Sequence, residues 1–216
     1  GANTYTGATT VSAGTLLVNG SLGNSALFVA ADATLGGSGS IAGPVTIANG
    51  GMISPGQSPG TLTTGSETWF RGAKYTWQLN DASDAPGAKG VSYDWVNING
   101  TLLVSATLGT PLTIYVTSLT AGNTPGTTPN FMPNQTYQWT LATASGGITG
   151  FNPDNVFINS LGFANDPLGA DAGRFAIAQA GNSIVLSYTT VPEPGMLALL
   201  GLGGLAIGAA RFRERA

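Results

Sequence analysis

Side chains able to carry out catalysis are few in this sequence. Histidine and cysteine are both absent, which excludes nucleophilic triads and the usual zinc sites. A glycosidase needs two carboxylates about 5–9 Å apart. The acidic residues before the C-terminal tail mostly stand beside Gly, Pro, Asn or Ser, as turn-forming aspartates do: Asp32, Glu67, Asp81, Asp84, Asp94, Asp154, Asp166 and Asp171. We therefore expect no enzymatic activity and no cofactor, with a polysaccharide lyase or hydrolase as the alternative.

Two acidic segments offer oxygen ligands that would suit calcium. They are the run from Asn80 to Asp84 and the pair Asp166 and Asp171. Their spacing matches neither an EF-hand nor the glycine-rich nonapeptide repeat, and aspartates that close Asx turns give the same pattern. We predict no metal site, and Asp81 and Asp84 are the residues that calcium would use if it bound.

The polarity of the chain comes from uncharged side chains. Only 8% of its 216 residues are charged, compared with about 25% in ordinary soluble domains. Before the tail, acidic residues outnumber the basic ones, which are Arg71, Lys74, Lys89 and Arg174. Nucleic-acid binding needs a basic stripe, so we predict no nucleic-acid partner.

Residues 1–66 consist of short Thr/Val/Leu segments separated by glycine turns such as Asn19-Gly20, Gly36-Gly37 and Pro59-Gly60. Strands this short bury their apolar faces only by stacking on similar neighbours. A parallel β-helix provides this stacking, because each coil adds one strand to each long sheet. We predict β-helix coils over residues 1–66.

Two segments of this region resemble the autotransporter-associated β-strand repeat. One is residues 3–16, with Asn3-Thr4-Tyr5-Thr6-Gly7 leading to Gly14-Thr15-Leu16. The other is residues 37–62, with its paired Ser54-Pro55-Gly56 and Ser58-Pro59-Gly60 steps. The resemblance covers about a third of the chain. It implies a right-handed β-helix on an exported protein.

Residues 67–190 keep the β character, with longer and more aromatic segments. The run from Tyr75 to Asn80 alternates apolar and polar residues. The same alternation occurs in residues 112–117, 137–141 and 184–188. We expect Trp77 and Trp139 in a core, with a carbohydrate-stacking platform as the alternative. Residues 99–104 echo residues 13–18. This region is therefore a looser β continuation of the solenoid or a sandwich-like capping domain.

The tail, residues 191–216, reads as a membrane segment. Residues 196–210 contain no charged or strongly polar side chain and would form a transmembrane helix of about 22 Å. Arg211, Arg213 and Arg215 follow it, and basic residues stay on the cytoplasmic side. We predict contact with membrane lipid through 196–210, with the residues before Pro192 on the other side.

Pro192-Glu193-Pro194, the apolar run and the arginines together resemble the PEP-CTERM sorting signal of Gram-negative bacteria. The resemblance implies recognition of Pro192, Glu193 and Pro194 by an exosortase-type membrane peptidase. It also implies a protein held first in the inner membrane and then found at the cell surface or outside the cell. The chain starts with Gly1 and shows no signal peptide, so we expect a further N-terminal part.

The sequence therefore predicts an all-β, non-enzymatic, exported structural or adhesive protein, in which the arginine tail fixes the orientation of the signal. The resemblance implies association with exopolysaccharide or biofilm matrix. The alternatives are a polysaccharide-modifying β-helix enzyme and a permanently anchored surface protein. Clustered carboxylates on one face would favour the enzyme, and a smooth Thr/Ser/Asn face would favour the structural protein.

Overall fold

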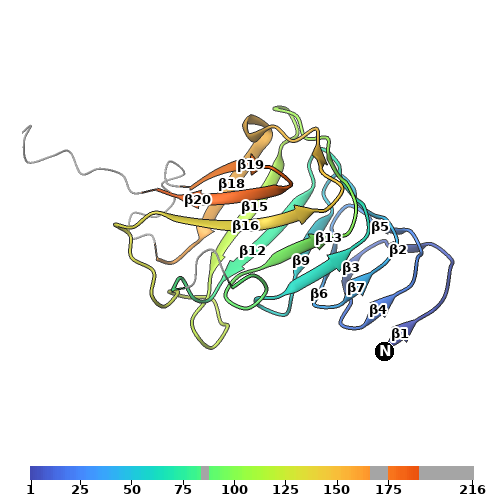
Figure 1. Cartoon of the computed structure of the whole chain (residues 1–216), viewed down its shortest axis with the longest axis horizontal. Coiled ribbons are helices and arrows are strands. Elements are labelled where there is room, and N and C mark those ends of the chain that lie inside the picture. Colours follow the sequence, from blue (N-terminus) through green and yellow to red (C-terminus); the bar gives the residue numbers. More distant parts are fainter. Residues whose placement is uncertain (84–87, 166–174, 190–216) are drawn as a thin grey trace, which may run out of the picture.

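The computed structural model describes residues 1–83, 88–165 and 175–189. Their strands form three sheets (Figure 1). In spatial order, sheet A contains β1 (Ala2–Asn3), β4 (Ser21–Leu22), β7 (Ser40–Ile41), β10 (Thr61–Thr64), β13 (Trp95–Ile98), β16 (Tyr137–Ala144), β20 (Ser183–Tyr188) and β19 (Phe175–Ala180).

Sheets B and C run through the same part of the molecule. Sheet B contains β2 (Thr9–Val11), β5 (Leu27–Val29), β8 (Val45–Ile47), β11 (Glu67–Trp69), β14 (Leu102–Val104) and β17 (Ile148–Thr149). Sheet C contains β3 (Gly14–Leu17), β6 (Ala33–Gly37), β9 (Met52–Pro55), β12 (Lys74–Leu79), β15 (Leu112–Ser118) and β18 (Val156–Gly162). A 3-10 turn, η1 (Pro153–Asn155), precedes β18.

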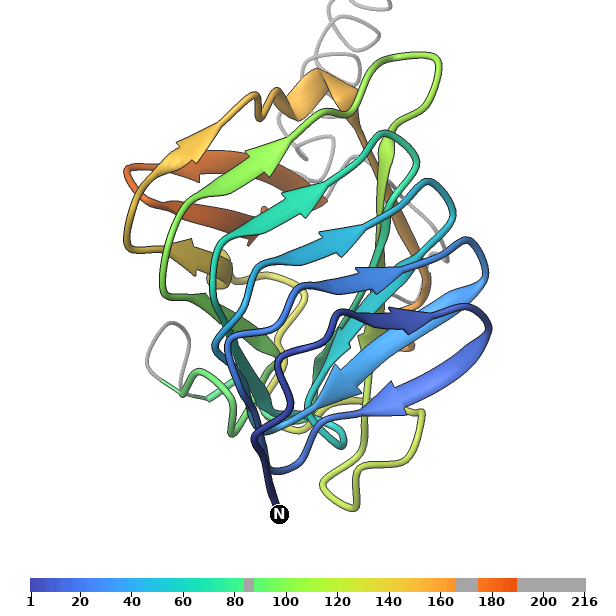
Figure 2. The same ribbon diagram turned by 90° about the vertical axis from the view of Figure 1, so that its right-hand side faces the viewer.

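The chain visits sheets A, B and C in turn up to β18, and each strand from β1 to β15 pairs in parallel with the strand three places later. One such circuit is a coil, so β1–β3 form coil 1 and β16–β18 form coil 6. Figure 2 shows the strands of successive coils lying side by side. The all-β class and the parallel stacking agree with the prediction, and the arrangement is consistent with a β-solenoid.

The core consists of columns of equivalent side chains from successive coils. In sheet B, paired residues place Val11, Val29, Ile47, Trp69 and Val104 in one buried column. In sheet C, Leu35 pairs with Ile53, which pairs with Tyr75. Alternation of inward and outward side chains explains the Thr/Val/Leu pattern, because each threonine between two apolar residues faces outward.

Coils widen toward the C-terminal end. The partner of Leu27 is Val45, whereas the partner of Leu102 is Ile148, so a late coil takes more than twice as many residues as an early one. The wider interior is filled by aromatic rings: Trp77 lies 5.3 Å from Trp139, and Trp139 stacks on Tyr137 at 5.3 Å. Trp77 and Trp139 are fully buried, which confirms that they belong to the core.

Parallel stacking ends after coil 6. Strand β20 pairs antiparallel with β16 on one side and with β19 on the other, which closes the C-terminal end of sheet A. Residue 66 lies between β10 and β11, and strands on both sides of it belong to the same three sheets. The division of the chain at residue 66 stays a prediction.

Within residues 1–83, 88–165 and 175–189, no helix has the length and the apolar character needed to cross a membrane. The apolar run 196–210, which we predict to form a transmembrane helix, lies outside the described residues.

Close backbone stacking at the corners makes some glycines irreplaceable. A β-carbon on Gly39 would lie 2.0 Å from the Gly20 carbonyl oxygen, whereas one on Gly109 would meet nothing within 4 Å. We therefore expect Gly39→Ala to lower the free energy of unfolding by about 1–3 kcal/mol, the usual cost of overpacking. Gly109→Ala is the matched control, and thermal melts of both variants measure the difference. Equal melting temperatures would show that the corner relaxes freely.

Candidate functional site

Glu67 lies inside the solenoid, a position that our sequence analysis did not assign to it. It faces inward from β11, between Val45 and Leu102 of the neighbouring coils, and is 2% exposed. The Thr64 hydroxyl donates to Oε1 at 2.7 Å, and the Trp69 indole N–H donates to Oε2. Burial raises the pKa of Glu67 from its ordinary value of 4.5 to about 7, although both hydrogen bonds act in the opposite direction.

Asp94 is the second buried carboxylate and connects neighbouring coils. It accepts hydrogen bonds from the backbone N–H of Gly60 at 2.8 Å and of Gln78 at 3.0 Å. Its own backbone carbonyl accepts one from the Trp77 indole at 3.0 Å. Burial raises the pKa of Asp94 well above its ordinary value. Asp94 therefore satisfies backbone donors at a corner, and its complete burial keeps it away from any polymer outside.

The alternation of β11 is the signal that locates Glu67. Glu67 and Trp69 are two residues apart in one strand and so face the same side. Because Trp69 is buried, Glu67 faces the core as well. The same rule places Trp95 and Asn97 on the outer side, since Val96 and Ile98 between and after them are buried.

The described acidic residues outside the core are far from one another in the fold. Asp32 lies at the corner between β5 and β6 of coil 2, and Asp154 lies in η1 of coil 6. Four coil spacings separate them, or about 19 Å, which exceeds the 5–9.5 Å of glycosidase carboxylates. Asp81 lies at a different corner, after β12. None of these three acids has a catalytic partner carboxylate among the described residues, since the other two, Glu67 and Asp94, are buried.

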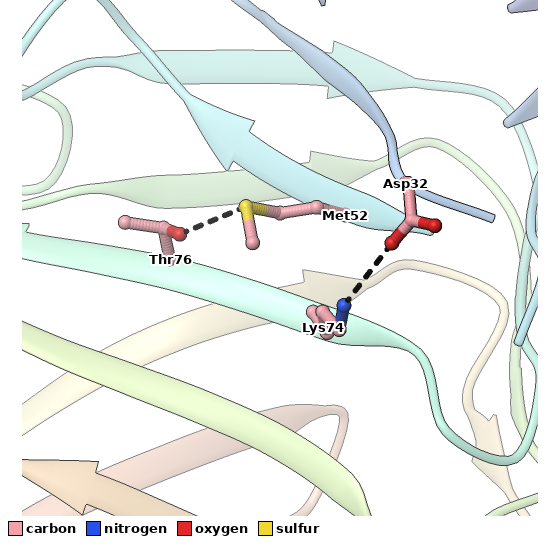
Figure 3. Close-up of polar contacts among 4 residues, drawn as sticks. All are labelled: Asp32, Met52, Lys74 and Thr76. Atoms are coloured by element: carbon pink, nitrogen blue, oxygen red, sulfur yellow. Dashed lines mark hydrogen bonds and ion pairs between the residues drawn. The ribbon is translucent and has the colours of Figure 1, made fainter. Parts of the chain in front are cut away.

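Asp32 forms a surface ion pair with Lys74 of strand β12 in sheet C (Figure 3). Its carboxylate lies 3.8 Å from the Lys74 ammonium, and the Asp32 side chain is 90% exposed. An exposed pair of this kind contributes little to stability. Nearby, the Thr76 hydroxyl donates to Met52 Sδ at 3.3 Å.

Asp81, one of the two calcium candidates, has hydrogen-bond donors around its carboxylate. Its Oδ1 accepts from the Ser83 backbone N–H at 2.9 Å and from Asn130 Nδ2 at 2.9 Å. These bonds, led by the one from Asn130, lower the pKa of Asp81. Asp84, the other candidate, lies outside the described residues. Among the described residues, no group of three or more His, Cys, Asp or Glu side chains could hold a metal ion.

The outer face of sheet A carries a continuous row of hydroxyl and amide side chains. Consecutive pairings across six strands align them, and each is partly exposed. We call this set the polar row: Ser21, Ser40, Thr63, Asn97, Thr143 and Ser183. All six members of the row are Ser, Thr or Asn.

Trp95 lies beside the polar row. Its indole N–H donates to the Thr143 hydroxyl at 3.3 Å, and that hydroxyl lies 3.2 Å from Ser183 Oγ. The Lys89 ammonium lies 5.0 Å from the centre of a Trp95 ring, a cation–π contact. Sequence analysis did not single out this partly exposed indole.

The predicted sorting residues and the basic tail lie outside the described residues: Pro192, Glu193, Pro194, Arg211, Arg213 and Arg215. The structure does describe where the chain leads into them. Strand β20 ends at Tyr188, which is fully buried, and it is hydrogen-bonded on both sides by β16 and β19. The tail therefore starts from a firmly held strand.

The comparison with known families decides the nature of this tail. Residues 190–214 match the family described as "PEP-CTERM protein-sorting motif". The tail carries a PEP-CTERM sorting motif. This motif indicates an exported surface protein.

A second comparison concerns an autotransporter protein. A stretch of 113 residues is 34% identical to "Adhesin BmaC autotransporter" of Brucella suis biovar 1 (strain 1330). The alignment covers 50% of this chain but only 3% of that protein. The similarity is consistent with the passenger-type repeats inferred from residues 3–16 and 37–62.

Glu67 makes the stability of the solenoid depend on pH. A carboxyl whose pKa is higher in the folded state stabilises the fold when it is protonated, and this contribution is lost as pH rises. The contribution of Glu67 should therefore be complete below about pH 4.5 and lost as pH rises through about 7. Relative to the wild type, Glu67→Gln should gain up to about 3 kcal/mol in free energy of unfolding between pH 5 and pH 8.

The glutamine keeps an acceptor for Trp69 and offers its amide N–H to the Thr64 hydroxyl, so the packing is preserved. Urea unfolding at a series of pH values measures the difference, and Asp154→Asn controls for the loss of one exposed carboxylate. A wild type and Glu67→Gln with parallel pH profiles would contradict the role of burial.

Proposed function

We propose that this chain is part of a non-enzymatic, exported surface protein. In this proposal an exosortase-type membrane peptidase processes the C-terminal signal, and the solenoid associates with exopolysaccharide or biofilm matrix. The observation that carries the proposal is the sorting motif at residues 190–214, joined directly to a solenoid that carries a row of hydroxyl and amide groups on the outer face of sheet A.

Each part of the tail has a physical role in this proposal. The prolines at 192 and 194 keep the chain extended and out of a helix, which leaves Glu193 accessible to a peptidase. The apolar run 196–210 spans the inner membrane and makes the anchored intermediate. The arginines at 211, 213 and 215 hold the far end on the cytoplasmic side.

Chain length limits how far the solenoid can stand from the peptidase. Pro192 follows Tyr188 by only four residues, so it lies within about 14 Å of the end of β20. Processing therefore takes place close to the closed C-terminal end of sheet A. A link of only four residues keeps the folded body near the membrane surface until the tail is cut.

The polar row supports the proposed association with matrix glycans. Its hydroxyl and amide groups repeat about every 4.8 Å along the solenoid, and each side chain both donates and accepts hydrogen bonds. Sugar hydroxyl groups have the same dual character. The acidic residues described outside the core are too dispersed for paired-carboxylate hydrolysis, which supports binding without chemistry.

The first experiment is mass spectrometry of the C-terminal peptide of protein recovered from the surface or medium of the native cell. The proposal expects a terminus near Pro192–Pro194, with residues 196–210 removed. An intact terminus at Ala216, found only in the membrane fraction, would show a permanently anchored protein instead.

Glu193→Gln tests the recognition element directly. The substitution removes a charge but keeps the size of the side chain, so we expect release of the protein from cells to fall at least tenfold while the chain still reaches the membrane. Immunoblots of membrane and medium fractions measure the ratio. Asp154→Asn, at an exposed position of the solenoid, controls for the loss of one negative charge. Release at the wild-type rate would remove Glu193 from the proposed role.

The polar row predicts where the matrix binds. Thr63→Ala together with Asn97→Ala should weaken retention on the native cell's exopolysaccharide about threefold or more, because each lost hydrogen bond is worth about 0.5–1.5 kcal/mol. Thr46→Ala with Thr68→Ala, on the outer side of sheet B, is the matched control. Affinity electrophoresis through gels containing the polysaccharide measures retention. Equal retardation of both double variants would place the contact elsewhere.

A further inference from the structure

Long connections from sheet C to sheet A gather at one corner of the solenoid, visible among the green and yellow loops of Figure 1. The early connections are short, as at residues 18–20 and 38–39, but those after β12 and β15 span 80–94 and 119–136. We call residues 80–83, 88–94 and 119–136 the corner loops. Insertions in repeat proteins map to one face, which is often the binding face.

The corner loops are held together by side-chain amides. Asn80 Nδ2 donates to Asn123 Oδ1 at 2.7 Å, and the Asp81 bond to Asn130 joins the same two loops. After β18, Asn165 joins them as well, since its Oδ1 accepts from the Thr128 backbone N–H at 2.6 Å. Three successive coils thus contribute to one connected surface.

Between the corner loops lies a cavity of about 420 Å³, a volume within the range of small-ligand sites. None of the described residues that line it is charged. Met132 and Tyr137 contribute to the wall, and the hydroxyl and amide side chains that line it are Ser83, Asn130, Gln135, Thr136 and Gln138.

The charge beside the cavity decides between ligand classes. Asp81 bonds to two lining residues, Ser83 and Asn130, and these bonds keep its pKa low, so the carboxylate is ionised at neutral pH. A fixed negative charge disfavours an anionic ligand. Amide and hydroxyl groups can donate to and accept from sugar hydroxyls, so the lining fits an uncharged, polyhydroxylated molecule.

The wall of the cavity is already ordered without a ligand. Tyr137 Oη accepts from the Met132 backbone N–H at 2.8 Å, and the Tyr137 ring stacks on buried Trp139. Asp81 holds the Asn130 side chain, and Asn130 has a φ of 60°. Binding therefore costs little further ordering of the Tyr137 and Asn130 side chains. Gln138 belongs to β16, the strand that also carries Thr143 of the polar row, so one polymer could contact both.

We propose that this cavity binds an uncharged sugar unit of the matrix polysaccharide. The inference rests on the proposed function and makes it more specific: the corner loops recognise a particular unit, and the polar row contacts the rest of the chain. Neither the sorting motif nor the autotransporter similarity assigns a ligand to this corner.

The test uses oligosaccharides released by mild acid from the native cell's own exopolysaccharide and separated into neutral and acidic fractions. Isothermal titration is carried out with protein recovered from the native cell. We expect the neutral fraction to bind, and Thr136→Ala combined with Gln138→Ala to weaken binding at least about tenfold. Both residues are exposed, so the fold should be retained, as near-ultraviolet circular dichroism would show.

Thr10→Ala with Gln57→Ala removes the same side-chain types from exposed positions of the early coils and should bind like the wild type. No binding of the neutral fraction, binding of the acidic fraction alone, or equal affinity of the Thr136/Gln138 variant would each overturn the inference. If the Thr136/Gln138 variant matches the wild type but intact polysaccharide is still retained, only this inference fails. If the wild-type protein does not bind intact polysaccharide, the proposed function fails as well.

Discussion

The parallel backbone ladder is the constraint on which the rest of this structure depends. Each strand must lie in register on the strand one coil earlier, so every inward position belongs to a column of stacked side chains. A residue inserted within a strand would turn the following side chains to the other face. Extra residues are therefore accepted at the corners, or where neighbouring strands lengthen together. The long connections lie at the corner where sheet C leads into sheet A.

Widening of the coils toward the C-terminal end changes what the core must contain. Early columns are filled by Val, Leu and Ile, whereas late ones require Trp, Tyr and Phe to span a larger interior. Wide interiors also hold the two buried carboxylates. Glu67 takes its hydrogen bonds from Thr64 and Trp69, and Asp94 takes them from the backbone at a corner. Neither requires a counter-ion beside it.

The proposed function is divided between a signal that is read as linear sequence and a surface that exists only when the coils are stacked. The sorting motif needs no fold beyond a strand to start from, and β20 provides that strand. The polar row and the cavity of the corner loops combine residues from many coils. A weakly charged outer face suits contact with a hydrated polymer, because many modest hydrogen bonds can form without the cost of desolvating ions.

Local patterns alone determined the sorting motif, the β class, the stacking of short glycine-bounded strands and the burial of Trp77 and Trp139. Each depends on nearest neighbours along the chain or on the two-residue period of a strand. Tertiary structure decided which sheet each segment joins and which residues of neighbouring coils pair. The echo between residues 13–18 and 99–104 is the clearest case, since the first lies in sheet C and the second in sheet B. Variable corner lengths shift the register between similar segments, so similarity in sequence does not imply equivalence in the fold. The polar row, the burial of Asp94 and the cavity beside Asp81 depend on that register, which is set by packing across coils.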